Sequence, residues 1–253
     1  MLHGHFLIVF YLARMKQVPY SIDILFILGT LFAVFLFYRA GVRQKGILAI
    51  LLVWMLIQMG IGLSGFYTDT QSLPPRFLLL ILPPFLTIIA LFTNRKGRDF
   101  IESMDGKMLT WLHVVRIPVE IALFVLFLHN QVPELMTFGG KNFDIAAGIS
   151  APFVAWLGYH RKQLDRSILL GWNFLCLALL CNIVINAILS APLPFQQQAF
   201  DMPNVAVMYF PYVWLPSVVV PLVLFSHLAC IWQLYRRKEE EINEPLEQGA
   251  TEI

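Results

Sequence analysis

Charged residues are scarce in this chain of 253 residues. They make up 13% of the sequence, whereas a soluble domain usually carries about 25% because its surface must be solvated. Hydrophobic residues reach 58%, and they are gathered in long runs, as expected of segments that face lipid. The shortage of charge excludes an ordinary soluble domain and predicts a multi-pass membrane protein, in the inner membrane if the source is bacterial.

Several functional classes lack their usual residues. The net charge of +2 gives no support for a nucleic-acid partner. The cysteines lie inside apolar runs without metal-ligand spacing, so we expect neither a disulfide framework nor a cysteine metal site. Zinc-protease, Walker A and dinucleotide glycine motifs are absent. No predicted span contains a lysine, which excludes a retinal Schiff base, and the third span ends in LFTNRKG, without the acidic-Arg-aromatic triplet of G-protein-coupled receptors.

The apolar runs predict an all-α, polytopic transmembrane helix bundle of about seven spans. Each run approaches the roughly 20 residues that cross a bilayer as a helix. Prolines at 83–84 in the third run, and at 211, 216 and 221 in the last, predict kinks or unwound turns. The predicted spans cover residues 20–38, 46–66, 75–93, 109–129, 143–159, 168–190 and 206–234.

The basic residues give the bundle an orientation. With the N-terminus outside, 13 of the 18 lysines and arginines fall in the cytoplasmic loops and the tail, which satisfies the positive-inside rule. We therefore expect a segment outside the cytoplasm at 1–19, a seven-helix domain at 20–235, and an acidic, disordered cytoplasmic tail at 236–253.

The fourth predicted span carries ionisable residues, which are costly in a membrane and therefore candidates for function. His113, Arg116 and Glu120 are spaced to share one helical face. Two interpretations stay open: Arg116 and Glu120 neutralise each other inside the bundle, or they serve a ligand or a proton.

A second histidine, His227, lies in the last predicted span at a similar depth to His113. If the two rings face each other, they are candidates to ligate a metal or a haem iron. A histidine that is only hydrogen-bonded within the bundle is the simpler alternative.

Other polar residues point to the outer half of the bundle. Asn182 and Asn186 lie one turn apart in the sixth span and either bond neighbouring helices or line a polar cavity with Gln58. Asp144 can cap the fifth span or bind a ligand. The outer loops are apolar and rich in aromatic residues and proline, so we expect them to fold back over the bundle as a lid.

These observations favour a bundle that binds or transports a small apolar or amphipathic molecule or lipid beneath the outer loops. The alternatives are a membrane-embedded enzyme or haem or metal redox protein using His113, Glu120 and His227, and a structural accessory subunit. Apart from the lipid bilayer, the sequence identifies no protein partner.

Overall fold

A computed structural model describes residues 18–41 and 43–250, with side chains up to Arg236. Most of the predicted outer segment 1–19 lies outside the described residues. Within the described part the regular secondary structure is helical, with no strands. The α-helices are α2 (Tyr20–Ala40), α3 (Lys45–Leu63), α4 (Leu78–Thr93), α5 (Arg95–Ser103), α6 (Gly106–Leu112), α7 (Arg116–Leu128), α8 (Asp144–Val154), α9 (Arg166–Leu189) and α10 (Val220–Ala250).

A π-helical turn adjoins each of α8 and α10, and a 3-10 turn joins α6 to α7. The π-helical turns are η4 (Ala155–His160), which follows α8, and η6 (Leu215–Val219), which leads into α10. The 3-10 turn η2 (His113–Val115) joins α6 to α7. Short 3-10 turns also lie in the loops, at η1 (Phe66–Thr68), η3 (Glu134–Met136) and η5 (Ala206–Met208).

The prediction of an all-α membrane bundle is confirmed in its coarser form. Among the described residues, five helices are long and apolar enough to cross a membrane, and the bent pair α4–α5 is a sixth candidate. The five are Tyr20–Ala40, Lys45–Leu63, Gly106–Leu128, Arg166–Leu189 and Leu215–Arg236. The predicted fifth span forms α8 and η4, whose 11 and 6 residues make a shorter segment.

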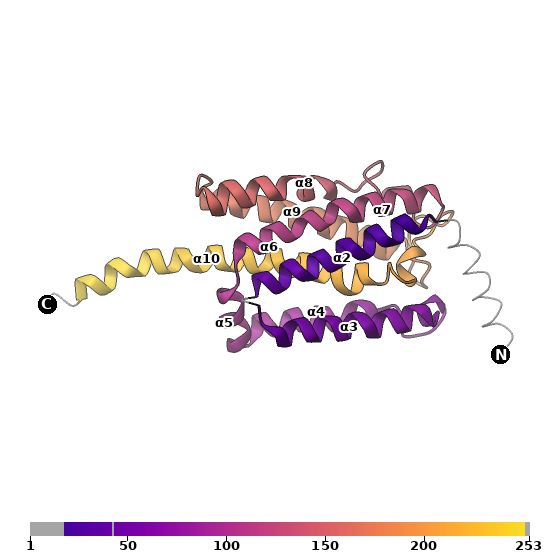
Figure 1. The fold of residues 1–253 in the computed structure, drawn as a ribbon, viewed down its shortest axis with the longest axis horizontal. Coiled ribbons are helices and arrows are strands. Elements are labelled where there is room, and N and C mark those ends of the chain that lie inside the picture. The colour runs from indigo at the N-terminus through magenta and orange to yellow at the C-terminus, as the bar shows by residue number, and fades with distance from the viewer. Residues whose placement is uncertain (1–17, 42, 251–253) are drawn as a thin grey trace.

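The long helices lie along one axis of the molecule, and α5 lies across one end (Figure 1). Successive segments alternate in direction, so the loops that follow α3 and α7 lie at the end opposite α5. We call the end that carries α5 the basic end, because Arg39, Arg95 and Arg161 lie at helix boundaries there.

The bend between α4 and α5 comes from local sequence. The two helices meet at 92°, and the Asn94 side chain caps α5 by accepting a hydrogen bond from Gly97 N at 2.7 Å. A Cβ atom on Gly97 would lie 2.2 Å from Leu91 O, so only glycine permits this close turn. Pro83 and Pro84, where the sequence predicts a kink or an unwound turn, lie inside α4, which stays α-helical. The 92° bend comes ten residues later.

The segment η6–α10 is the centre of the bundle and α3 is its periphery. In their apolar windows, 67% of Leu215–Arg236 is buried but only 17% of Lys45–Leu63. Two indoles attach α3 to the centre: Trp54 Nε1 donates to Ser217 O at 2.9 Å, and Trp214 Nε1 donates to Met55 O at 3.0 Å. Ser217 O is available because Pro221, four residues later, has no N–H to donate.

The α10 helix continues to Ala250 (Figure 1). The predicted cytoplasmic tail begins after Tyr235, and the backbone of its residues up to Ala250 continues this helix. The run of arginine, lysine and glutamate after Tyr235 consists of good helix formers, so charge alone does not end the helix.

The outer loops pack against the bundle, as expected. Gln131, Asn142 and Asn204 are buried although they lie between helices. Backbone bonds join the two loops, because the N–H groups of Val205 and Ala206 both donate to Gln131 O at 3.1 Å. Together residues 129–143 and 190–214 form a cover over the end opposite α5, and we call them the outer cover, after the side of the membrane that the sequence predicts for them.

Candidate functional site

The α6–η2–α7 segment delivers a cluster of buried polar side chains to the middle of the bundle. The α-helical pattern gives way to a 3-10 turn at His113–Val115, just before Pro118, whose missing N–H removes the bond to Val114 O. Mid-helix 3-10 turns often mark functional positions. His113, the first residue of this turn, and Arg116, which directly follows it, are buried, and Glu120 is buried one helical turn further along.

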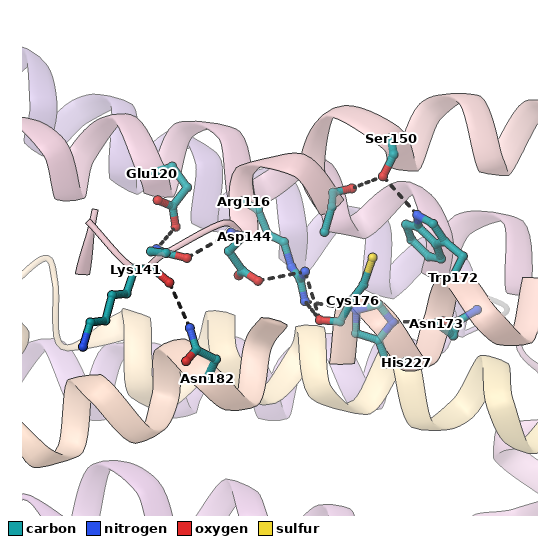
Figure 2. A network of polar contacts seen from close by, with 12 residues as sticks. Arg116, Glu120, Lys141, Asp144, Ser150, Trp172, Asn173, Cys176, Asn182 and His227 are labelled. Atoms are coloured by element: carbon teal, nitrogen blue, oxygen red, sulfur yellow. Dashed lines mark hydrogen bonds and ion pairs between the residues drawn. The ribbon is translucent and has the colours of Figure 1, made fainter. Parts of the chain in front are cut away.

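Arg116 is the hub of the cluster (Figure 2). Its Nη1 lies 3.1 Å from Asp144 Oδ1 of α8, its Nη2 lies 3.0 Å from His227 Nε2 of α10, and both nitrogens lie 3.4 Å from Cys176 O of α9. One guanidinium therefore connects α7, α8, α9 and α10. A buried charge needs such partners, because desolvation is otherwise prohibitive.

The arginine fixes the tautomer of His227. A guanidinium only donates hydrogen bonds, so His227 Nε2 must accept and carries no proton. The proton then lies on Nδ1, which donates to Asn173 Oδ1 at 2.9 Å. His227 is therefore a neutral imidazole held between a cation and an amide oxygen.

His113 stacks on His227 in the described structure. Their ring centroids lie 3.8 Å apart with an angle of 18° between the planes, and Trp172 meets His113 edge-on at 5.5 Å. Trp172 is held by its own bond from Nε1 to Ser150 Oγ at 3.0 Å (Figure 2). Both ring nitrogens of His113 are buried without a hydrogen-bond partner among the described side chains.

This stacking gives no support to a metal or haem iron between the two histidines. Imidazole lone pairs lie in the ring plane, so nearly parallel rings in contact do not direct them to one point. The described residues also contain no group of three or more His, Cys, Asp or Glu side chains arranged for a metal ion. The two imidazole rings instead stack face to face beside Arg116.

Glu120 has a different partner from the one considered at the sequence level. Arg116 forms its ion pair with Asp144, while Glu120 Oε1 accepts a hydrogen bond from Asn142 Nδ2 in the outer cover. The counterion of Arg116 is therefore not Glu120 on the same helix. It is Asp144 on α8, which lies beside the guanidinium. Glu120 Oε2 is buried and has no hydrogen-bond partner among the described side chains.

Asp144 does not cap α8 with its carboxylate. The N-cap position is Phe143, and the helix N-terminus is instead served by Asn142 Oδ1, which accepts from Asp144 N at 3.0 Å. The carboxylate turns inward to Arg116 because that buried cation offers a stronger interaction than a backbone N–H group. Asn142 thus contacts Glu120 and positions Asp144 through the backbone.

Two asparagines of α9, Asn182 and Asn186, serve the outer cover. Asn182 Nδ2 donates to Lys141 O at 3.0 Å (Figure 2), and Asn186 Nδ2 donates to Asn182 O at 3.0 Å. Gln58 lies apart on α3, where Tyr67 Oη donates to Gln58 Oε1 at 2.5 Å. Burial raises the pKa of Tyr67, just beyond α3, to about 12. These contacts therefore do not form the polar cavity that was predicted as one alternative for Gln58, Asn182 and Asn186.

A cavity of about 80 Å³ reaches the polar cluster from the end of the bundle that carries the outer cover. Arg116, Glu120 and Asp144 lie on its wall, and the remainder is almost entirely apolar. Asn204 and Val207 of the outer cover also line it. The cavity approaches the lateral surface between α4 and α9, because several of the lining side chains from these helices are only half-buried. These side chains are Ile81, Phe85, Val184, Ala187 and Ile188.

The structure brings together five of the sequence-predicted site residues and leaves two at the outer rim. His113, Arg116, Glu120, Asp144 and His227 form the cluster, while Asn182 and Asn186 support the outer cover. Sequence reasoning missed Asn142, Asn173 and Trp172 as members. Asn142 and Asn173 carried a weak signal, as amides in apolar surroundings, whereas Trp172 carried none.

A family model described as "Domain of unknown function (DUF8737)" matches residues 74–235. That match covers more than half of the chain. The chain belongs to this family. The matched region begins before α4 and ends at Tyr235, so it includes all members of the polar cluster and leaves α2 and α3 outside. No curated protein and no solved structure matches the chain.

Proposed function

We propose that this member of the family crosses the membrane seven times, with its N-terminus outside and its C-terminus in the cytoplasm. Support comes from α4 and α8–η4, which lie along the same axis as the five longer helices (Figure 1). The alternation of these segments gathers most basic residues at the end that carries α5, as the positive-inside rule requires of a cytoplasmic face.

The position of α8–η4 can be tested by cysteine labelling. In intact cells, a membrane-impermeant maleimide should label Lys141→Cys, which precedes α8, but label Gln163→Cys, which follows η4, only after permeabilisation. Both positions are exposed, and labelling is measured by the mass shift of the purified protein.

The unsubstituted protein sets the background for this experiment, since Cys176 and Cys230 are buried and Cys181 is exposed on α9. Labelling of both new cysteines on the same side would show that α8–η4 does not cross. Labelling on opposite sides but in the reverse order would invert the proposed orientation.

We further propose that the protein binds a small amphipathic molecule in the cavity beneath the outer cover. The observation that carries this proposal is Glu120: one carboxylate oxygen is bonded to Asn142, and the other is buried, without a hydrogen-bond partner, beside a cavity with apolar walls. An unsatisfied buried carboxylate oxygen costs free energy. A bound donor removes that cost.

The chemistry of the cavity defines the class of molecule. The two terminal nitrogens of Arg116 are already bonded to Asp144, His227 and Cys176 O, while its Nε is buried without a hydrogen-bond partner in the described part of the chain. Glu120 Oε2 is a vacant acceptor on this wall, and it takes a donor such as a hydroxyl or an amine. About 80 Å³ holds only a few non-hydrogen atoms, given that water occupies about 30 Å³ in the liquid. The polar end is therefore small, and an apolar remainder lies toward the gap between α4 and α9.

Ligand retention tests this function. Native mass spectrometry of protein purified from membranes should show a retained small molecule, and Ile183→Trp should lose it because Ile183 lines the cavity. Leu175→Trp is the matched control, since Leu175 is 62% exposed on the same helix. Glu120→Gln, which keeps an oxygen for Asn142, should weaken retention roughly tenfold or more, the usual loss for a hydrogen bond to a charged group.

Two results would contradict binding at this cavity. One is retention by Ile183→Trp equal to that of the unsubstituted protein. The other is the absence of any retained molecule when the protein is extracted under conditions that preserve bound lipid. The second result would favour a structural accessory subunit, in which the polar cluster only joins helices. An absorbance band of a haem or flavin in the purified protein would instead favour the redox alternative.

A further inference from the structure

A second and much larger cavity lies on the other side of α10. Its volume is about 710 Å³, within the range of roughly 300–1,000 Å³ that small-molecule sites occupy. It is bounded by α3, α4 and η6–α10 and reaches α5 at the basic end. It shares no lining residue with the cavity at Glu120, so the two are independent.

The cavity is long, and Trp54 lies at one end of it. Along α3 it extends from Gln44 to Trp54, a rise of roughly 15 Å in a helix. At the Trp54 end, the hydrogen bond from the indole to Ser217 O crosses between α3 and the central segment. The walls between the two ends are aliphatic and aromatic, for example Leu51, Leu91 and Phe225. An extended hydrocarbon chain fits this shape and this lining.

The opposite end is polar and carries excess positive charge. Gln44, Lys96, Asp99 and Ser103 lie at this end of the cavity. Basic residues flank this end of the cavity, at positions 43 and 45 and in α5. Helix α5 also has two acidic residues, and one of them, Glu102, forms an ion pair with Arg236 at 3.2 Å. The basic residues of these two segments are Arg43, Lys45, Arg95, Lys96 and Arg98.

Helix α5 has the geometry of a segment at a membrane surface. It turns 92° away from α4, its Gly97 and Ile101 are buried, and its Arg95 and Lys96 are exposed. An amphipathic helix in this position places its basic side chains at the depth of lipid headgroups. Basic pockets between transmembrane helices at this level are typical sites for anionic lipid headgroups.

We propose that one anionic phospholipid occupies this cavity, with its phosphate at Lys96 and an acyl chain extending along α3 to Trp54. The hydrocarbon would cover the inner faces of α3 and α4, which are separated by the cavity. The headgroup would complement the basic residues of α5 and the 43–45 loop. Charge selects an anionic headgroup over a zwitterionic one, and the Trp54 indole, bonded to Ser217 O, marks the far end of the chain's path.

The test uses the full-length protein reconstituted in vesicles of equal amounts of phosphatidylglycerol and phosphatidylcholine. After mild detergent extraction, native mass spectrometry should show one retained phospholipid, mainly phosphatidylglycerol. Lys96→Gln should lower the preference for phosphatidylglycerol about fivefold, the effect of one basic residue near an anionic headgroup. Lys162→Gln removes a charge from another loop at the same end and should leave the preference unchanged.

A second pair of variants tests the hydrocarbon part. Leu51→Trp should abolish retention of the phospholipid because Leu51 lines the cavity, whereas Leu52→Trp, 40% exposed on the same helix, should keep it. The proposal is overturned by equal retention of the two phospholipids, by no retention, or by retention that survives Leu51→Trp. Because Lys96 is at the surface, its variant remains informative even if Leu51→Trp fails to fold.

Discussion

Replacing Arg116 with methionine should lower the free energy of unfolding by about 3–5 kcal/mol, the usual cost of leaving one partner of a buried ion pair without its counterion. The substitution leaves the Asp144 carboxylate buried and unpaired, and it also removes the donor to His227 Nε2. Replacing both residues, as Arg116→Met with Asp144→Leu, should recover much of the loss, because an apolar pair needs no counterion. Equilibrium unfolding in one detergent compares both variants with the unsubstituted protein.

Arg76 provides the matched control for this cycle. Its ion pair with Asp69 is shorter, at 2.7 Å, but the two side chains are 38% and 36% exposed. Because solvent screens exposed pairs, Arg76→Met should cost at most about 1 kcal/mol. An equal loss from Arg76→Met and Arg116→Met, or a double variant as unstable as Arg116→Met alone, would contradict the role of Arg116 as the buried hub.

Replacing Gly148 with leucine should destabilise the fold by about 1–3 kcal/mol, the range for an overpacked site. A Cβ atom at Gly148 would lie 3.0 Å from Ile117 Cγ1 and 3.2 Å from both Arg116 Cβ and Ile117 N. A larger side chain must therefore push α8 away from α7 at the level where Asp144 and Arg116 meet. Thermal unfolding should show a lower midpoint.

Gly171 offers the comparison for this substitution, because a Cβ atom there meets nothing within 4 Å. Gly171→Leu should leave stability unchanged or raise it slightly, since leucine has the higher helix propensity. If Gly148→Leu were as stable as Gly171→Leu, the close approach of α7 and α8 would not constrain the polar cluster.

The sequence was sufficient to locate the long apolar helices, because hydropathy is a local property. The positions of α2, α3 and α9 follow directly from runs of apolar residues. The same runs could not predict α5, whose turn depends on the Asn94 cap and on the contact between Gly97 and Leu91. These are features of a few side chains and leave little trace in a hydropathy profile.

The residues of the candidate site were more predictable from the sequence than the contacts between them. Arg116 and Glu120 were identifiable because ionisable residues in an apolar run are costly. Their partners were not, because helical spacing relates residues of one helix and says nothing about neighbours. Spacing made Glu120 the natural partner of Arg116, whereas packing placed Asp144 against the guanidinium and Asn142 against the Glu120 carboxylate.

The two indole bonds of α3 also determine how this peripheral helix can move. Trp54 and Met55 are adjacent, so both bonds to the central segment act at one level of α3. The nine residues of α3 on the basic side of this level run along the 710 Å³ cavity. A tilt of these residues about this level would change the width of the cavity and leave both bonds in place, and the fluorescence of the Trp54 indole would report it.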